Sequence, residues 1–269
     1  MRDQLRRFLP VLLLAVACLY TYKLEVPETH TYPAAGITRL DATTQNGAIS
    51  VTASQDTVIT INVVKYAYGR DRADAEEALE NVVYTDTVVG DELRVKAEMP
   101  SGGRPHGASY TIAAPESTDL SLATTNGDVS VTNAVGDINV GTTNGKVELT
   151  GTTGTASVST TNGRLNVVVH SGAFYGATTN GAIDCDLTAL RPTEAVGLST
   201  TNAKVTLLLP DDVSALIEAT NTNGLITIYD FTVTYETQGE NHIRARIGSG
   251  ASNVTITTTN GDVVVRSRS

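Results

Sequence analysis

The segments TTNGDVSV (124–131), TTNGKVEL (142–149), TTNGRLNV (160–167) and TTNGAIDC (178–185) decide the fold of this chain. Their asparagines recur every 18 residues, and looser copies lie on both sides. A segment that repeats at a fixed interval indicates an architecture in which each copy is one structural unit stacked on its neighbour. The eight copies carry Asn46, Asn126, Asn144, Asn162, Asn180, Asn202, Asn223 and Asn260.

Apolar residues alternate with polar ones on both sides of each Asn-Gly pair. After the glycine they stand at the second and fourth positions, as in Val129 and Val131. A period of two predicts a strand with one buried face. A second turn, such as Val135-Gly136-Asp137, separates neighbouring copies. Each unit therefore reads as strand, turn, strand, turn.

Two architectures satisfy this pattern. Asn-Gly is a strong hairpin signal, which favours an antiparallel β-sandwich or meander. A β-solenoid, with stacked coils of about 18 to 22 residues, also explains why Thr-Thr-Asn recurs, because stacked Asn side chains form a hydrogen-bonded ladder and Thr side chains pack in columns. We predict an all-β solenoid and keep the sandwich or meander as the alternative. In the solenoid, Cys185 faces inward in one column with Val131, Leu149 and Val167.

The repeats divide the chain after its N-terminus into three parts. Residues 37–61 form the first β-repeat, residues 62–114 a strand/helix insertion or cap, and residues 115–269 the TTNG-repeat solenoid. Within the insertion, the sequence RDRADAEEALEN predicts a helix over 70–81. Tyr229, Phe231 and Tyr235 lie between the last two copies. We expect them to pack in a longer coil or a closing strand pair, with a ligand patch as the alternative.

The N-terminus resembles an export signal. A basic head precedes the apolar run 8–17, which predicts a signal peptide over residues 1–17. The sequence LAVAC (14–18) resembles the bacterial lipobox, so we predict that Cys18 is acylated and that residues 18–36 are a lipid-anchor linker. The alternatives are a single-pass uncleaved anchor and a periplasmic or secreted protein. Acylation of Cys18 would leave Cys185 without a disulfide partner.

The charge of the chain restricts its partners. The formal net charge is −10, and removing residues 1–17 leaves 16 basic and 28 acidic residues. An acidic surface argues against nucleic acid and anionic membrane faces as partners.

We expect no enzyme, no catalytic residue, no metal and no cofactor. His30, His106, His170 and His242 are far apart in the sequence and lack metal-ligand spacing. We expect His170 to be a solvated residue at a coil corner. The lesser alternative is a carbohydrate-active β-helix enzyme, in which Asp184 and Asp186 lie on an outward face near Glu148 and Asn166. No basic partner is expected for these carboxylates.

The order of motifs is similar to that of a bacterial family of β-strand-repeat envelope proteins, a domain of unknown function labelled "putative adhesin". The likeness covers residues 35–266 and includes, in order, LDATTQNGAISV (40–51), RADAEEALENV (72–82), SYTIAAPESTDLSLATTNGDVSV (109–131) and GSGASNVTITTTNGDVVV (248–265).

The resemblance implies a non-enzymatic cell-envelope protein that acts as an adhesin-like structural or binding module. An envelope-stress-linked regulatory or scaffold protein is the alternative. Expected partners are an unidentified envelope protein or glycan, the membrane through the N-terminal lipid or anchor, and a second copy through the coil edges.

Overall fold

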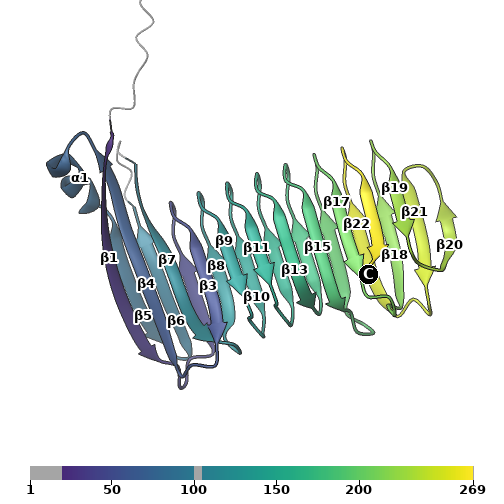
Figure 1. Ribbon diagram of the computed structural model, residues 1–269, viewed down its shortest axis with the longest axis horizontal. Coiled ribbons are helices and arrows are strands. Elements are labelled where there is room, and N and C mark those ends of the chain that lie inside the picture. The colour runs from purple at the N-terminus through teal and green to yellow at the C-terminus, as the bar shows by residue number, and fades with distance from the viewer. Residues whose placement is uncertain (1–19, 100–104, 269) are drawn as a thin grey trace, which may run out of the picture.

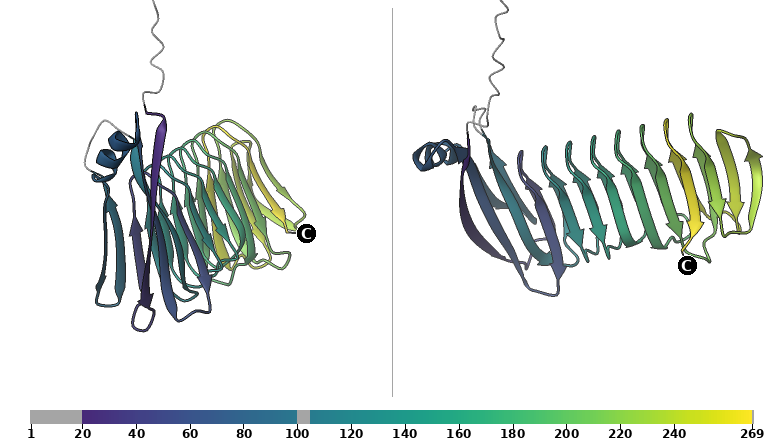
Figure 2. Two further views of the ribbon diagram at one scale, coloured as in Figure 1. Left: turned by 60° about the vertical axis from the view of Figure 1, so that its left-hand side comes forward. Right: turned by 45° about the horizontal axis from the view of Figure 1, so that its top comes forward.

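The computed structural model describes residues 20–99 and 105–268. Its strands form two long sheets that face each other along a rod (Figures 1 and 2). Sheet A has the order β1 (Tyr22–Pro33), β4 (Val58–Gly69), β7 (His106–Pro115), β3 (Ile49–Ser54), β9 (Val129–Thr132), β11 (Val147–Thr150), β13 (Leu165–Ser171), β15 (Ile183–Ala189), β17 (Val205–Leu209), β23 (Val263–Ser267), β19 (Ile226–Tyr229).

Sheet B has the order β20 (Val233–Gln238), β21 (His242–Ile247), β18 (Ala215–Thr220), β22 (Ser252–Thr257), β16 (Ala195–Ser199), β14 (Phe174–Ala177), β12 (Ala156–Ser159), β10 (Ile138–Gly141), β8 (Asp119–Ala123), β2 (Arg39–Thr43), β6 (Glu92–Glu98), β5 (Val83–Val89). Each coil of the repeat gives one strand to each sheet. Neighbouring coils pair in parallel and in register, as in Leu149 opposite Val131 and Val167. The predicted solenoid is therefore confirmed, and antiparallel pairing is confined to the two ends of the rod.

The core consists of apolar columns between the two sheets. Inward residues of successive coils stack directly, and Cys185 lies in the predicted column beside Val167. One column changes size locally: Phe174 is fully buried next to the small Ala156. A Cβ at Gly176 would lie 2.8 Å from the Phe174 ring, so this glycine makes room for the only buried phenylalanine of the described core.

The glycine of the repeat is required by close backbone approach. A Cβ at Gly163 would lie 1.6 Å from the carbonyl oxygen of Gly145 in the preceding coil. Gly127, Gly145 and Gly181 show the same approach at 1.9, 1.7 and 1.7 Å. None of these four glycines has positive φ, so the turn is not the type I′ hairpin turn that Asn-Gly favours. In the copy that carries Asn202, Ala203 occupies the position of this glycine.

A cap closes the N-terminal end of the rod. It comprises β1, β4 and β7 in sheet A, β5 and β6 in sheet B, and helix α1 (Arg72–Leu79), which packs on β4 and β1 (Figure 1). The helix lies within the predicted range 70–81. The Asp71 side chain accepts a hydrogen bond from the Asp74 N–H at 2.9 Å and so caps its first turn.

The prediction of a linker over residues 18–36 is wrong for its central part. Residues 22–33 form β1, which pairs antiparallel with β4 over its whole length. The inward residues of β1 include Glu28 and His30, which are only half-buried. A strand whose inner face carries charged residues lacks the apolar alternation by which strands are recognised in a sequence.

The C-terminal coil is inserted into the stack out of sequence order. β22 lies between β16 and β18, and β23 lies between β17 and β19. The coil of β18 and β19 lies beyond the coil of β22 and β23 in the stack, although it precedes that coil in the sequence. The antiparallel hairpin β20–β21 then extends sheet B beyond β18 (Figure 1). A closing strand pair is therefore present, but of the three aromatic residues expected to pack there only Phe231 packs against the core, while Tyr229 and Tyr235 are exposed.

The close approach of the glycines predicts the effect of one methyl group. We expect Gly163→Ala to destabilise the protein by about 1–3 kcal/mol, because the coils must separate to admit the Cβ. The measurement is the urea-unfolding midpoint followed by circular dichroism. Gly141→Ala is the matched control, since a Cβ there meets only the Ser159 Oγ at 3.8 Å. Equal midpoints for the two variants would contradict the close-packing explanation.

Candidate functional site

The eight predicted asparagines lie in one continuous row, which we call the asparagine ladder. In all of them but Asn46, the Nδ2 donates to the asparagine Oδ1 of the coil before it in space, with distances of 2.7 Å for Asn126, Asn144, Asn162 and Asn180, 2.8 Å for Asn202 and Asn223, and 2.9 Å for Asn260. The spatial order is Asn46, Asn126, Asn144, Asn162, Asn180, Asn202, Asn260, Asn223, because the last coil in sequence is inserted. The ladder thus joins every coil along one edge of the rod.

Buried threonines run beside the ladder. The first Thr of each TTNG segment donates its hydroxyl to the carbonyl of the residue that directly follows the ladder asparagine of the preceding coil, as Thr160 does to Gly145 O at 3.1 Å. The hydroxyls of Thr124, Thr142, Thr178, Thr200 and Thr258 make the equivalent bond to the neighbouring coil. These bonds explain why a polar residue is buried at this position in each of these coils.

The two ends of the ladder differ. At the cap, Asn46 Nδ2 donates to the His106 carbonyl of β7 at 3.1 Å, so the donor end is satisfied. At the other end, Asn223 Oδ1 accepts no hydrogen bond from the part of the chain that the structure describes. The ladder therefore ends in an unpaired acceptor beside β19, the edge strand of sheet A.

The four outward residues considered for acid-base chemistry lie close together on sheet A, as predicted. Glu148 is opposite Asn166, and Asn166 is opposite Asp184. The expectation that these carboxylates lack basic partners is wrong. Arg164 pairs with Asp184 at 2.5 Å, Arg268 with Asp186 at 2.7 Å and Lys146 with Glu148 at 2.6 Å. The hydrogen bond from Lys146 lowers the pKa of Glu148.

Lys146 and Arg164 directly precede β11 and β13, and Arg268 follows β23, which is two strands away from the β15 carboxylate that it reaches. Arg268 is 82 residues from Asp186 in sequence and reaches it only because the last coil is inserted beside β17. Each of the three carboxylates, Glu148, Asp184 and Asp186, thus takes part in an ion pair on the surface. Within residues 20–99 and 105–268, no three His, Cys, Asp or Glu side chains come together as a metal site.

His170 is not the solvated corner residue that the sequence suggests. It is completely buried, and its Nδ1 lies 2.8 Å from the Thr152 hydroxyl and its Nε2 3.2 Å from the Ala173 carbonyl. Since a carbonyl can only accept, Nε2 carries the proton and Nδ1 accepts from Thr152 in the neutral ring. Burial lowers the pKa of His170. A bulge in β13, with Val169 at φ 60°, turns this ring inward.

A polar cluster joins the two sheets at the cap. His30 Nδ1 on β1 lies 2.9 Å from Asp86 Oδ2 on β5, and the Tyr84 hydroxyl donates to the same oxygen at 3.0 Å. Burial, with a hydrogen bond to Asp86, raises the pKa of Tyr32 to about 12. These contacts link the edge strands β1 and β5 and close the end of the core.

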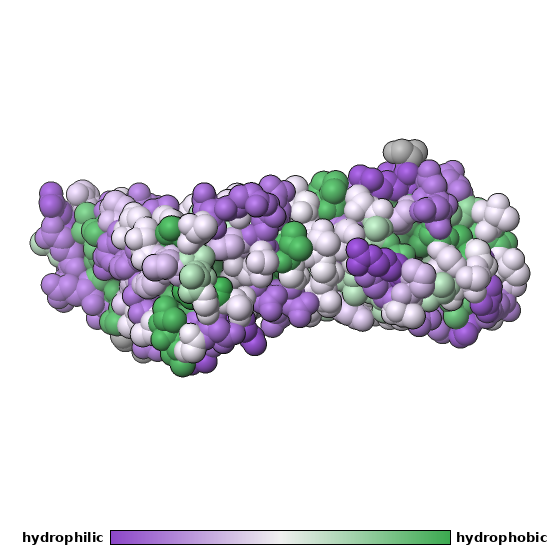
Figure 3. All heavy atoms as spheres, turned by 90° about the horizontal axis from the view of Figure 1, so that it is seen from below, coloured by the Kyte–Doolittle hydropathy of each residue, from purple (hydrophilic) through white to green (hydrophobic). Residues whose placement is uncertain are grey.

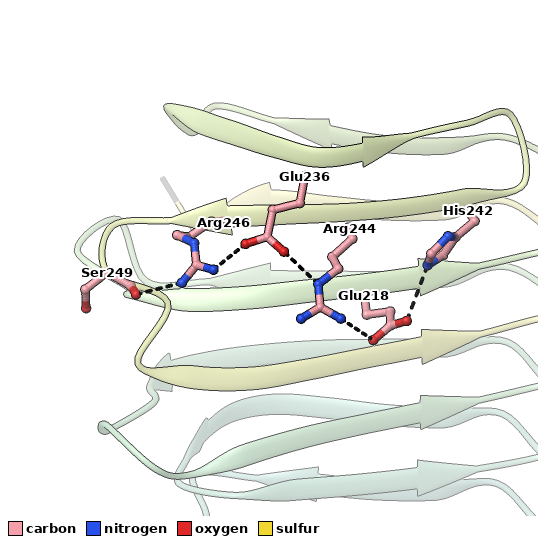
Figure 4. A network of polar contacts seen from close by, with 6 residues as sticks. All are labelled: Glu218, Glu236, His242, Arg244, Arg246 and Ser249. Atoms are coloured by element: carbon pink, nitrogen blue, oxygen red, sulfur yellow. Dashed lines mark hydrogen bonds and ion pairs between the residues drawn. The ribbon is translucent and has the colours of Figure 1, made fainter.

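A second charged network fixes the hairpin at the opposite end (Figure 4). Arg244 on β21 donates to Glu236 on β20 at 2.7 Å and lies 3.7 Å from Glu218 on β18, which His242 also approaches at 3.3 Å. Arg246 pairs with Glu236 and donates to the Ser249 carbonyl at 3.1 Å. Hydrogen bonds from Arg246 and Arg244 lower the pKa of Glu236. The network ties β20 and β21 to the coil that carries β18.

Cys185 is buried, which raises the pKa of its thiol and makes it a packing residue. Cys18, the predicted acylation site, and the signal peptide over 1–17 lie outside the described residues. No helix among the residues that are described is long and apolar enough to cross a membrane.

The fold and the ladder define a β-solenoid of two-strand coils that is capped at one end. The chain belongs to the Toastrack DUF4097 family, whose profile matches residues 31–266. This finding confirms the family resemblance of the sequence motifs. The family is a domain of unknown function.

Two solved structures are similar to this chain. One is a putative cell adhesion protein from Clostridium sporogenes ATCC 15579, with 11% identity over 91% of this chain and 100% of the other, at a TM-score of 0.39. The other is a putative adhesin from Bacteroides fragilis NCTC 9343, with 8% identity over 90% and 97% of the two chains, at a TM-score of 0.30. No curated protein matches the sequence.

The ladder predicts the cost of removing one donor from its middle. Asn162→Asp keeps the size of the side chain but cannot donate to Asn144 Oδ1, so we expect a loss of about 1–3 kcal/mol in the free energy of unfolding at pH 7. Asn253→Asp is the control, because Asn253 is exposed and its side chain makes no hydrogen bond within the described chain. Urea unfolding measures both, and an equally small effect in both would show that the ladder contributes little.

Buried His170 predicts a pH dependence. Because its pKa in the folded state lies below the unfolded value of 6.5, protonation favours the unfolded chain. Stability should therefore fall as the pH drops from about 6.5 toward 5, above the range in which the carboxylates titrate. His170→Gln should lose this slope between pH 7 and 5 in thermal unfolding, whatever its stability at pH 7. An unchanged slope would contradict a buried, neutral ring.

Proposed function

We propose that this protein is a non-enzymatic, adhesin-like binding module of the cell envelope. In this proposal, the N-terminal segment attaches the rod to a membrane through acylated Cys18, and the solenoid holds its opposite end away from that surface. The observation that carries the proposal is the difference between the two ends. The chain enters the rod at the cap, where the sheet A edge β1 carries prolines and charged residues, whereas at the far end sheet A stops at the edge strand β19, which has no proline (Figure 1).

The rod is suited to act as a spacer. Sheet A contains eleven strands, and at about 4.8 Å between strands they extend over about 50 Å. Parallel in-register pairing, the asparagine ladder and the threonine bonds connect each coil to the next. Because every coil is held by its neighbours, such a stack is a rigid rod.

The surface supports binding rather than catalysis. Carboxylates on the outer face of sheet A are held in ion pairs with Arg164, Arg268 and Lys146. In Figure 3, apolar side chains form several separate groups along this face of the rod, with hydrophilic side chains between them. Exposed apolar side chains do occur at both ends, on β5 at the cap and around β19 and β20 at the far end, and a partner protein would bury apolar area there.

A hollow beside the cap favours a second candidate, the binding of a glycan. Its volume is about 540 Å³, and its lining includes Tyr66, Tyr68, Lys23 and Asn46. The Lys23 ammonium lies 5.2 Å from the centre of the Tyr66 ring and 5.8 Å from that of Tyr68. Tyrosine rings with amide and ammonium groups nearby supply stacking surfaces and hydrogen bonds for a sugar.

The proposal predicts that binding depends on which end of the rod is free. In a Cys18→Ala chain, a cysteine introduced for Val88 at the cap or for Tyr235 at the far end provides one site for biotin, because Cys185 is buried. Val88 and Tyr235 are both exposed. We expect streptavidin beads that hold the protein through the cap to retain several-fold more envelope fragments of the host than beads that hold it through residue 235.

Equal densities of protein on the two bead sets are the control. Equal retention, or more retention when the far end is attached to the bead, would contradict display of that end. Protease or glycosidase treatment of the fragments then shows whether the bound component is protein or glycan. Loss with glycosidase alone would favour the glycan candidate.

A further inference from the structure

Strand β19 is a free edge of sheet A. Its only strand partner is β23, which lies parallel to it with Ile226 opposite Val263. The Val263 N–H donates to the Leu225 carbonyl at 2.8 Å. Because peptide groups alternate sides along a strand, those of Ile226 and Ile228 face away from β23, where the described chain supplies no strand. Two donors and two acceptors are thus available on this edge.

The side chains around this edge are only partly covered. Leu225 is 71% exposed, and Tyr229 and Tyr235 are also exposed. Ile226 and Ile228, which continue the two buried columns of sheet A, are half-buried although the equivalent residues of β23 are buried. The apolar columns therefore reach the end of the stack without a final covering strand.

Asn221 is a second sign that this end is incomplete. It takes the place of the buried threonine of the other coils and is 3% exposed. Its Nδ2 and Oδ1 have no hydrogen-bond partner in the described structure. Such an unpaired carboxamide is costly, and it stands in the same coil as the unpaired Asn223 Oδ1. The two groups place unused hydrogen-bonding capacity at the end of the ladder.

The opposite edge of sheet A does not share these features. β1, the opposite edge of sheet A, carries Pro27 and Pro33, which lack an N–H, and the charged Lys23 and Glu25. Proline and charge are the usual means by which an edge strand avoids pairing. β1 is therefore a poor partner for β19 of another copy in a head-to-tail chain.

End-to-end contact between two copies is also hindered. The β20–β21 hairpin extends sheet B two strands past β18, while sheet A stops at β19 of the same coil. If β19 paired with β19 of a second copy, the two hairpins would meet in the same space. The charged network of Glu236, Arg244 and Arg246 fixes the hairpin in this position (Figure 4). The edge accordingly suits one added strand and not a second rod.

We propose that β19 binds an extended segment of a partner protein as an additional parallel strand, in the register that the coils themselves use. The segment would carry an amide donor, as in Asn, opposite Asn223, and small or branched apolar residues at the third and fifth positions after it, opposite Ile226 and Ile228. A preceding Thr would donate to the Gly224 carbonyl. This inference rests on the proposed function and specifies its partner as a strand-donating protein.

The register follows from the chain's own coils. In the inserted coil of β22 and β23, Asn260 donates to Asn202 and Thr258 donates to the Ala203 carbonyl. Val263 and Val265 of β23 continue the columns. The segment TTNGDVVVRS (258–267) therefore contains the features that the β19 edge would recognise. An acetylated and amidated peptide of this sequence is a direct probe.

The test measures binding of the fluorescent peptide to the whole protein by anisotropy. We expect saturable binding that weakens at least tenfold when the central Val of the peptide, equivalent to Val264, is replaced by Pro, because that N–H would donate to Ile226 O. Ile228→Lys in the protein should weaken binding at least tenfold. Val88→Lys, at an exposed valine of edge strand β5, should leave it unchanged.

Hydrogen exchange supplies a readout that does not depend on a variant. The peptide should slow amide exchange at Ile226 and Ile228 and leave β5 unaffected. Binding lost in Val88→Lys, protection confined to other strands, no saturable binding, or a dimer at the β19 edge in sedimentation would each overturn strand addition. If Ile228→Lys still retains envelope fragments on cap-attached beads, strand addition fails while the proposed function stands.

Discussion

The fold depends on the close contact between successive turns at the TTNG edge. The glycine lets the backbone of one coil approach the carbonyl of the preceding coil, where any Cβ would overlap an oxygen atom. At this separation the threonine hydroxyl reaches the same backbone, and the asparagine side chains reach one another at 2.7–2.9 Å. One tetrapeptide thus sets the spacing, the register and the direction of stacking for both sheets.

This constraint also explains which features the sequence predicted. The period of two assigns Val129 and Val131 to the inner face, and the 18-residue repeat requires identical asparagines to stack once the coils are parallel. The same alternation predicts that the Cys185 side chain lies in the inward column. These features are local or repeat along the chain, so they can be predicted from the pattern of residue types.

The features that the sequence did not predict depend on non-local pairing. β1 is a strand because β4 pairs with it, although its inner face carries Glu28 and His30. His170 is buried because a bulge at Val169 shifts the alternation. Arg268 meets Asp186 only because the last coil is inserted between two earlier ones. The spacing of residues in the sequence does not indicate which coils are neighbours at the ends of the rod.

The insertion of the last coil has a functional consequence. Because β22 and β23 occupy the place next to β16 and β17, the coil of β18 and β19 becomes the terminal one, with Asn221 and Asn223 unsatisfied at its corner. The repeat thereby creates both the rigid rod and the open edge at its end. At the other end, contacts among His30, Tyr84 and Asp86 join β1 of sheet A to β5 of sheet B, so the edges of the two sheets are linked there.

The order of strands at this end is therefore the central claim, and disulfide trapping tests it most directly. Thr206 of β17 is opposite Val264 of β23, and Val264 is opposite Thr227 of β19. In a Cys18→Ala chain, cysteines at 206 and 264 should form a disulfide under mild oxidation, whereas cysteines at 206 and 227, two strands apart at about 10 Å, should not. Efficient bridging of 206 to 227, with none between 206 and 264, would contradict the inserted coil and the identity of the free edge.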